Sequence, residues 1–232
     1  MLDAYCGRGA TVAVAQRLGR KWIGINITYQ SISLILKRFQ DTYEKNGTWP
    51  QVEAGIQLDG VPRDLESAMA LANRKDDKTR KEFEKWAVLT YSRNQARINE
   101  KKGADAGIDG VAYFLKDKGE NGKAIFQVKS RPGTRADLAT LTSDRLREGA
   151  EFGFLICTGP LALSKAMLGE IQAAGKYRHP LLDREDDWLQ VVMVAELFAP
   201  HNRRLNLPMA RADALRAAQA LGDAGKQAAL DI

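Results

Sequence analysis

Three side chains that could hold a metal ion and a water molecule lie close together in the sequence: Asp109, Gln127 and Lys129. A carboxylate and a side-chain amide both offer oxygen atoms, the ligands that Mg²⁺ prefers in proteins. A lysine ammonium beside them could orient an attacking water and offset the negative charge that develops during reaction. An acid, an amide and an amine in one place therefore suit the hydrolysis of a phosphodiester bond.

Two predicted strands, 107–115 and 123–129, bring these residues together in a hairpin. Both strands are rich in apolar residues, and the residues between them include Gly119, Asn121 and Gly122. Glycine and asparagine supply the backbone freedom that a tight turn needs. We therefore expect an antiparallel hairpin with its turn centred near Gly119.

The register of this hairpin decides which side chains meet. With a turn at that position, Asp109 lies opposite Lys129. Successive side chains of a strand point to opposite faces, so Gln127 shares a face with Lys129. Phe126 and Val128 then form an apolar back face. The reactive groups are expected at one end of the hairpin.

The motif order resembles the PD-(D/E)xK nuclease superfamily in its QxK variant, and most closely the Mrr-like restriction endonucleases. The resemblance rests on Gly-Ala-Asp-Ala-Gly-Ile-Asp-Gly, which ends at Gly110, and on Gln-Val-Lys-Ser, which begins at Gln127. It covers residues 71–208. It implies a restriction-endonuclease-like mixed-sheet domain that cleaves DNA with Mg²⁺, with Asp109 and Gln127 as metal ligands and Lys129 acting on the attacking water.

The same resemblance implies a glutamate on a preceding helix, within a Phe-Glu pair that is here Phe83-Glu84. Phe83, Trp86 and Ala87 follow helical spacing and should face the core. Glu84 lies beside that stripe and is the expected third metal ligand. Glu82 lies two positions away, and a surface glutamate paired with a lysine remains the alternative for either residue.

Simpler structural roles also remain open for the other site residues. Asp109 could be a turn residue between two glycines, and Gln127 with Lys129 could form the solvated face of an edge strand. Downstream of the hairpin, the order of predicted elements fits the same resemblance: a basic helix at 134–149, a strand at 152–158, a helix at 160–175 and a strand at 189–194.

The first 45 residues predict a different unit, a strand, a Gly-x-Gly turn at Gly7 and Gly9, a helix and a second strand at 21–27. Such a turn lets a nucleotide-like ligand approach the backbone. A helix at 29–43 follows. This β-α-β pattern predicts a partial Rossmann-like fold.

Residues 3–11 and Trp-Ile-Gly-Ile-Asn at 22–26 resemble the permuted amino-DNA methyltransferases. The resemblance implies S-adenosylmethionine binding by five residues: Asp3, Cys6, Gly7, Gly9 and Asn26. Ala4 stands where that family has proline, and Asn26 where it has the acid that holds the ribose. No Asp-Pro-Pro-Tyr or Asn-Pro-Pro-Tyr segment occurs. We therefore expect an incomplete methyltransferase unit, with an N-terminal half missing and no useful cofactor binding.

The composition agrees with a DNA-binding protein. The net charge is +6 and the isoelectric point is about 9.3, which suits a polyanionic partner such as double-stranded DNA. Basic residues gather near the expected site, and three are predicted DNA contacts: Arg131, Arg135 and Arg145. The two cysteines suggest a reducing cytoplasm, and no membrane segment or signal peptide is expected.

Together these patterns predict an α/β protein of a restriction-modification system. Its parts would be a partial methyltransferase unit at 1–45, a connector at 46–70 with a short strand at 52–58, an endonuclease domain at 71–208 and a helical tail at 209–232. The alternative is a DNA amino-methyltransferase whose nuclease-like domain binds DNA without cutting it. A homo-oligomer is left open.

Overall fold

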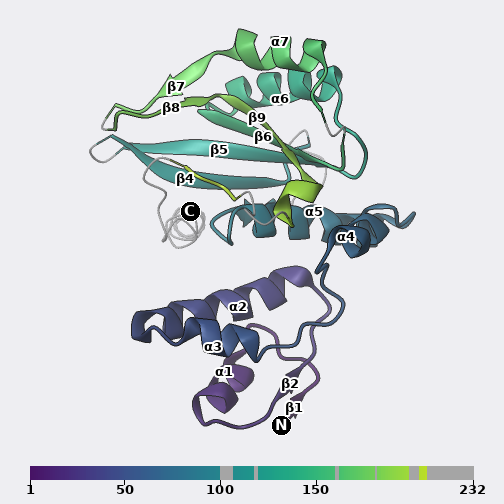
Figure 1. The fold of residues 1–232 in the computed structure, drawn as a ribbon, viewed down its shortest axis with the longest axis vertical. Coiled ribbons are helices and arrows are strands. Elements are labelled where there is room, and N and C mark those ends of the chain that lie inside the picture. The colour runs from purple at the N-terminus through teal and green to yellow at the C-terminus, as the bar shows by residue number, and fades with distance from the viewer. Residues whose placement is uncertain (100–106, 118–119, 160–161, 181, 199–203, 208–232) are drawn as a thin grey trace, which may run out of the picture. The chain divides into compact units, whose positions relative to one another are not determined.

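A computed structural model of the protein describes residues 1–99, 107–117, 120–159, 162–180, 182–198 and 204–207 (Figure 1). The chain divides into two units, Met1–Arg63 and Asp64–Ile232. The predicted tail at 209–232 lies outside the described residues.

The first unit is a small β-α-β arrangement followed by helices. Its elements are β1 (Leu2–Asp3), α1 (Ala10–Arg17), β2 (Ile23–Gly24), α2 (Tyr29–Tyr43), the 3₁₀ helix η1 (Glu44–Asn46) and α3 (Trp49–Ala54). Strands β1 and β2 pair in parallel. A core of Cys6, Val12, Ile35 and Phe39 holds α1 and α2 together.

The predicted strand at 52–58 is wrong, because α3 extends through Ala54 and residues 55–58 form no strand. Pro50 lies in the first turn of that helix. Proline is well tolerated there, since its missing N–H would have no partner inside the helix and its φ angle already suits helical geometry.

The second unit holds a five-stranded mixed sheet with helices on both faces. Its elements are α4 (Leu65–Ala72), α5 (Asp77–Tyr91), β3 (Arg97–Ile98), β4 (Gly110–Asp117), β5 (Glu120–Lys129), α6 (Arg135–Arg147), β6 (Phe152–Cys157), α7 (Lys165–Ala174), β7 (Lys176–Arg178), β8 (Glu185–Asp187), β9 (Leu189–Met193) and the 3₁₀ helix η2 (Val194–Leu197). The strand order is β3-β4-β5-β6-β9. Pairs β3-β4 and β4-β5 are antiparallel, whereas β5-β6 and β6-β9 are parallel.

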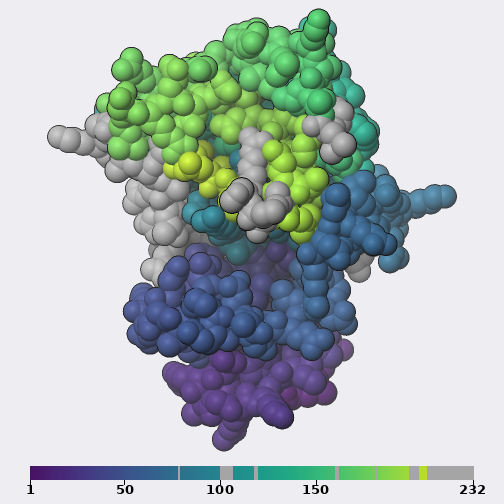
Figure 2. Space-filling model, viewed as in Figure 1, coloured from purple at the N-terminus to yellow at the C-terminus, as the bar shows by residue number. Residues whose placement is uncertain are grey.

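Helix α5 covers one face of this sheet, and α6 and α7 cover the other (Figure 1). On the α5 face, Tyr91 packs against Phe126 and Phe154, whose rings stack 5.2 Å apart. On the α6 face, Ile125 and Leu155 belong to a buried apolar cluster with residues of α6 and α7. In the view of Figure 2, side chains of the green segments, α7 and the β7–β8 hairpin, cover much of the sheet. Central strand β5 is therefore buried on both sides.

Short polar residues determine where the two principal helices begin. The Asp76 carboxylate accepts a hydrogen bond from the Thr79 N–H at the start of α5. The Thr134 hydroxyl and the Asp137 carboxylate form a reciprocal capping box at the start of α6. Such caps satisfy backbone N–H groups that have no partner within the helix. The capping box at Thr134 starts α6 shortly after the carboxyl end of β5.

The β4–β5 hairpin is confirmed, but its predicted register is wrong by two residues. Gly110 pairs with Phe126, so Asp109 lies across from Gln127 instead of Lys129. The strands continue to Asp117 and from Glu120, with an irregularity between Leu115 and Asp117. Residues 120–122, expected in the turn, are therefore part of β5.

Two features of the second unit were not predicted. The β7–β8 hairpin and the short strand β3 have no counterpart among the predicted elements. The helix expected from residue 160 begins at Lys165, because Ser164 caps it by accepting a hydrogen bond from the Met167 N–H. Both cysteines are free and buried, as expected for a chain without a disulfide framework.

Candidate active site

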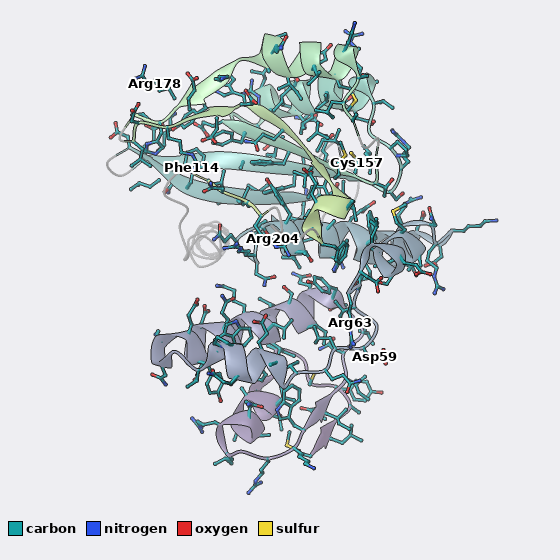
Figure 3. The ribbon with its side chains drawn as sticks, in the orientation of Figure 1. Asp59, Arg63, Phe114, Cys157, Arg178 and Arg204 are labelled. Atoms are coloured by element: carbon teal, nitrogen blue, oxygen red, sulfur yellow. The ribbon has the colours of Figure 1, made fainter. Side chains whose placement is uncertain are left out.

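The predicted reactive residues gather at the carboxyl end of β5. Lys129 is the last residue of that strand and pairs with Cys157 of β6. Figure 3 shows Cys157 and Phe114 toward opposite ends of the sheet, so the site lies at the Cys157 end. Central strands of a sheet are among the best supported elements of a fold, and side chains at their ends are held in fixed positions.

Asp109 lies just before β4 and is tied to β5 at two points. Its backbone N–H donates to the Phe126 carbonyl at 2.8 Å, and its carboxylate accepts the Val128 N–H at 2.7 Å. Burial, followed by the negative charge of Glu84, raises the pKa of the Asp109 carboxyl to about 7. The Val128 hydrogen bond and the positive charges of Lys129 and Lys81 oppose this rise only in part. The Asp109 carboxyl therefore holds its proton more strongly than a free aspartate does.

Glu84 reaches this site from α5 on the α5 face of the sheet. It is half-buried, and burial raises its pKa, while the charges of Arg80, Lys81 and Lys129 lower it. Glu82 instead forms an ion pair with Lys85 at 2.9 Å. The surface-pair alternative thus describes Glu82, and Glu84 is the acid of α5 that interacts with Asp109.

Gly110 lets α5 come close to the hairpin. A Cβ atom at this position would lie 2.8 Å from a methyl carbon of Val88 and 3.3 Å from the Arg97 carbonyl oxygen. Val88 follows Glu84 by one helical turn on α5. The absence of a side chain at Gly110 therefore leaves room for the turn of α5 that follows Glu84 to pack against the start of β4.

Gln127 is only 1% exposed, which excludes the solvated edge-strand alternative for this residue. Its amide nitrogen donates to the Asp144 carboxylate of α6 at 2.5 Å. The other oxygen of Asp144 accepts from the Arg147 guanidinium at 2.6 Å. The Gln127 side-chain oxygen is buried and has no hydrogen-bond partner among the described residues. A buried amide oxygen without a partner is a candidate ligand for a cation.

Two lysines supply positive charge here. The charges of Lys129 and Lys81 lower the pKa of both Asp109 and Glu84, so both ammonium groups lie within electrostatic reach of the two acids. Lys81 is exposed on α5, whereas Lys129 is partly buried. The described part of the chain shows no ion pair within 4.0 Å for Lys129, which leaves its ammonium available to a water or a phosphate.

The donor set fits a hard divalent cation. Asp109 and Glu84 are electrostatically coupled carboxylates from different elements, and Gln127 of β5 offers an unpaired amide oxygen; oxygen atoms are the ligands that Mg²⁺ prefers. No group of three or more His, Cys, Asp or Glu side chains suited to a metal occurs in the described ranges.

The three arginines predicted to contact DNA differ in their surroundings. The Arg131 guanidinium makes two hydrogen bonds to the Asp137 carboxylate, at 2.8 and 2.9 Å. Arg135 is exposed and pairs with Glu170 of α7 at 2.7 Å. Both remain accessible from the site end of α6.

Arg145 is only 4% exposed, which does not fit the predicted phosphate contact. Its guanidinium lies 4.4 Å from the centre of the Trp188 ring and donates to the Ala150 carbonyl. Burial lowers its pKa. We therefore assign Arg145 to the core.

Sequence reasoning missed Asp144, although a signal was present. The buried residues of α6 follow one helical stripe, and three of them are charged: Asp137, Asp144 and Arg145. Charged residues at positions where helical periodicity favours apolar ones indicate specific buried contacts.

In the first unit, the predicted cofactor residues surround one loop. Gly7 and Gly9 have positive φ angles of 48° and 75°, and Gly9 directly precedes α1. The Asn26 amide nitrogen donates to the Gly7 carbonyl at 2.9 Å, and its oxygen accepts the Ile27 N–H. Cys6 is buried beneath the loop, and the Asp3 carboxylate accepts the Tyr5 N–H. Asn26 thus holds the loop itself.

A mixed five-stranded sheet with helices on both faces and acids at the end of its central strand is consistent with a restriction-endonuclease-like fold. Residues 76–178 match the model of the Mrr_cat family, described as a restriction endonuclease. This segment spans α5 to β7 and contains Glu84, Asp109, Gln127 and Lys129. Comparison with curated proteins and with solved structures gave no match for the chain. No match to a methyltransferase was found.

Proposed function

We propose that the second unit is a Mg²⁺-dependent DNA endonuclease of the QxK type in a restriction-modification system. The observation that carries this proposal is the electrostatic coupling of Asp109 to both Glu84 and Lys129, at the end of the strand whose Gln127 has a buried side-chain oxygen without a described partner. PD-(D/E)xK restriction endonucleases generally use Mg²⁺ and act on DNA. None of the helices in the described ranges has the length and apolar character that a membrane span requires.

Each residue has a distinct part in the proposed reaction. Asp109, Glu84 and the Gln127 side-chain oxygen would hold Mg²⁺. The bound ion would stabilise negative charge on the phosphate during hydrolysis. The Lys129 ammonium would orient the attacking water and offset charge on the scissile phosphate. Since glutamine replaces an acid, the ligand set carries one negative charge fewer, and Mg²⁺ should bind tightly only with DNA phosphate present.

Two substitutions test the endonuclease proposal. Asp109→Ala removes a proposed metal ligand, and Lys129→Ala removes the group proposed to position water. Each should therefore lower Mg²⁺-dependent cleavage at least 100-fold. This corresponds to a loss of about 2.7 kcal/mol of transition-state stabilisation. Supercoiled plasmid and Mg²⁺, with gel separation of nicked and linear products, give the measurement. Asp117→Ala, on an exposed residue at the other end of β4, is the matched control and should cleave normally.

The same variants distinguish the competing function. Circular dichroism should show that both remain folded, and a gel-shift assay should show that both still bind DNA. If both variants cleave like the parent, the endonuclease proposal fails. If the parent binds DNA but never cleaves it with Mg²⁺ or Mn²⁺, the domain is a non-catalytic DNA-binding module. The neutral Gln127 in the ligand set is the observation that favours this alternative.

For the first unit we propose a partial S-adenosylmethionine-binding fold related to amino-DNA methyltransferases. Two features support this: the parallel β1–β2 pair beside a Gly7-x-Gly9 loop, and the exposed apolar residues Leu2 and Ile23 of these two strands. Within this sequence the methyltransferase catalytic motif is absent.

Calorimetry tests the cofactor part of this proposal. We expect no useful binding of S-adenosylmethionine, because the loop residues alone do not enclose the ligand and the Asn26 amide is already hydrogen-bonded within the loop. Micromolar affinity, about −8 kcal/mol, would overturn this expectation. An Asn26→Asp variant shows whether a carboxylate at this position improves binding.

A further inference from the structure

Gln127, whose side-chain oxygen is a proposed metal ligand, belongs to a chain of hydrogen bonds with two further polar side chains. The Gln127 amide nitrogen donates to one oxygen of Asp144, and Arg147 donates to the other. Gln127 and Asp144 are 1% and 3% exposed, and they belong to different elements, β5 and α6. Water therefore has little access to the bond between Gln127 and Asp144, whereas the Arg147 side chain is 47% exposed.

This arrangement determines which end of the Gln127 amide faces the site. A carboxylate only accepts hydrogen bonds, so Asp144 binds the nitrogen end of the amide and never the oxygen end. Arg147 only donates, which keeps Asp144 in its accepting role. The Gln127 oxygen consequently points away from Asp144, and no described residue donates to it.

We infer that Asp144, held by Arg147, is a positioning residue that fixes the Gln127 amide with its oxygen toward the metal ion. This inference rests on the proposed endonuclease function. A glutamine amide can rotate by half a turn and present its nitrogen instead, which would repel a cation. The Asp144 carboxylate opposes that rotation, because the rotated amide would direct its oxygen at the carboxylate.

Asp144→Asn tests the inference with almost no change in volume. Since Arg147 requires an acceptor, the introduced amide should turn its oxygen to Arg147 and its nitrogen to Gln127. Gln127 must then rotate and place its own nitrogen at the site. Mn²⁺ affinity of the full chain, measured by calorimetry, should fall at least tenfold. The metal concentration for half-maximal plasmid cleavage should rise by a similar factor.

Asp137→Asn is the matched control, because Asp137 is another buried aspartate of α6 that pairs with an arginine, Arg131. It makes no contact with Gln127 in the described structure, so Mn²⁺ affinity should stay within about twofold of the parent. Thermal melting of both variants without metal shows whether any loss comes from unfolding.

A double substitution, Gln127→Glu with Asp144→Asn, should restore the Mn²⁺ affinity that Asp144→Asn loses. The introduced amide nitrogen would donate to one oxygen of the new carboxylate and leave the other oxygen for the ion, so Mn²⁺ affinity should return at least to the parent level. If Asp144→Asn binds Mn²⁺ like the parent, or if the double variant shows no recovery, the inference is overturned while the endonuclease proposal stands. A parent that neither cleaves DNA nor binds Mn²⁺ overturns both.

Discussion

Asp109 and Glu84 illustrate how residues of a site can oppose the stability of their own fold. Both carboxyls are partly buried, and burial raises the pKa of each. The charge of Glu84 also raises the pKa of Asp109, which reaches about 7. Without a cation, ionising Asp109 therefore costs more free energy in the folded protein than in the unfolded chain.

This cost predicts a pH dependence of stability in the metal-free protein. Between about pH 4 and pH 7 the folded state holds a proton on Asp109 that the unfolded state has lost, so the free energy of unfolding should decrease as the pH rises. Asp109→Asn removes this titration. With EDTA at pH 7.5, it should be more stable than the parent by about 1–2 kcal/mol, a value reduced for partial exposure.

Urea unfolding followed by circular dichroism measures the effect at pH 4.5 and pH 7.5. The stability gain should be larger at the higher pH and small at the lower one. Glu82→Gln, at an acid that already has a lysine partner, serves as the control and should show no such gain. Equal stability of Asp109→Asn and the parent at both values would show that Asp109 ionises in the fold at little cost.

At the scale of elements, the orientation of α5 decides which glutamate serves the site. Glu82 and Glu84 are two residues apart and point in different directions on the helix. Glu84→Gln should lower Mg²⁺-dependent cleavage at least tenfold, because it removes one of two negative charges from the metal ligands. Glu82→Gln should retain activity, since it loses only an ion pair with Lys85 worth less than about 1 kcal/mol.

Plasmid cleavage at several Mg²⁺ concentrations measures both variants. Higher Mg²⁺ should partly recover Glu84→Gln if the residue acts through the metal. Loss of activity in Glu82→Gln with full activity in Glu84→Gln would instead exchange the roles of the two acids.

Much of the element order could be predicted from sequence, because apolar periodicity and turn residues carry it. Helix α2 occupies 29–43 as predicted, and the hairpin and strands β6 and β9 lie where expected. The hairpin register could not be predicted, since the irregularity between Leu115 and Asp117 depends on pairing geometry. The β7–β8 hairpin was missed because Glu185–Asp187 lacks the apolar residues typical of strands.

Only some residues of the candidate site could be predicted from the sequence, for a similar reason. Asp109, Gln127 and Lys129 lie in one motif, and a local pattern can identify them. Asp144 contacts Gln127 from a helix 17 residues further along the chain, and only the folded structure brings the two together. Arg145, the next residue, was predicted as a surface cation because its burial against Trp188 has no local signature.

At the scale of the whole molecule, a net charge of +6 favours DNA but does not locate the contact. Two exposed cations lie at the site end of the second unit, Lys81 on α5 and Arg135 at the start of α6. Lys81→Gln with Arg135→Gln should weaken DNA binding roughly tenfold or more. The slope of log affinity against log salt should become shallower by about 2, as expected for two lost phosphate contacts.

Arg178→Gln is the control for this prediction, because Arg178 lies toward the end of the sheet opposite Cys157 (Figure 3). It is 79% exposed, so its loss should affect neither folding nor a contact at the site end. Fluorescence anisotropy with a labelled duplex at three salt concentrations gives both affinity and slope. If all variants retain the parent slope, DNA contacts some other surface of the protein.

Gly110 limits which amino-acid substitutions the protein can accept without losing activity. It holds no metal, contributes no charge and offers no side chain to DNA, yet a methyl group there would meet Val88 and the Arg97 carbonyl. Gly110→Ala should therefore push α5 outward and separate Glu84 from Asp109, reducing cleavage at least tenfold while circular dichroism still reports a folded protein. A genetic screen for bacteria that survive expression of an otherwise toxic nuclease should accordingly recover substitutions at Gly110 alongside those at the acids. Retention of the activity would then depend on a residue that has no reactive group of its own.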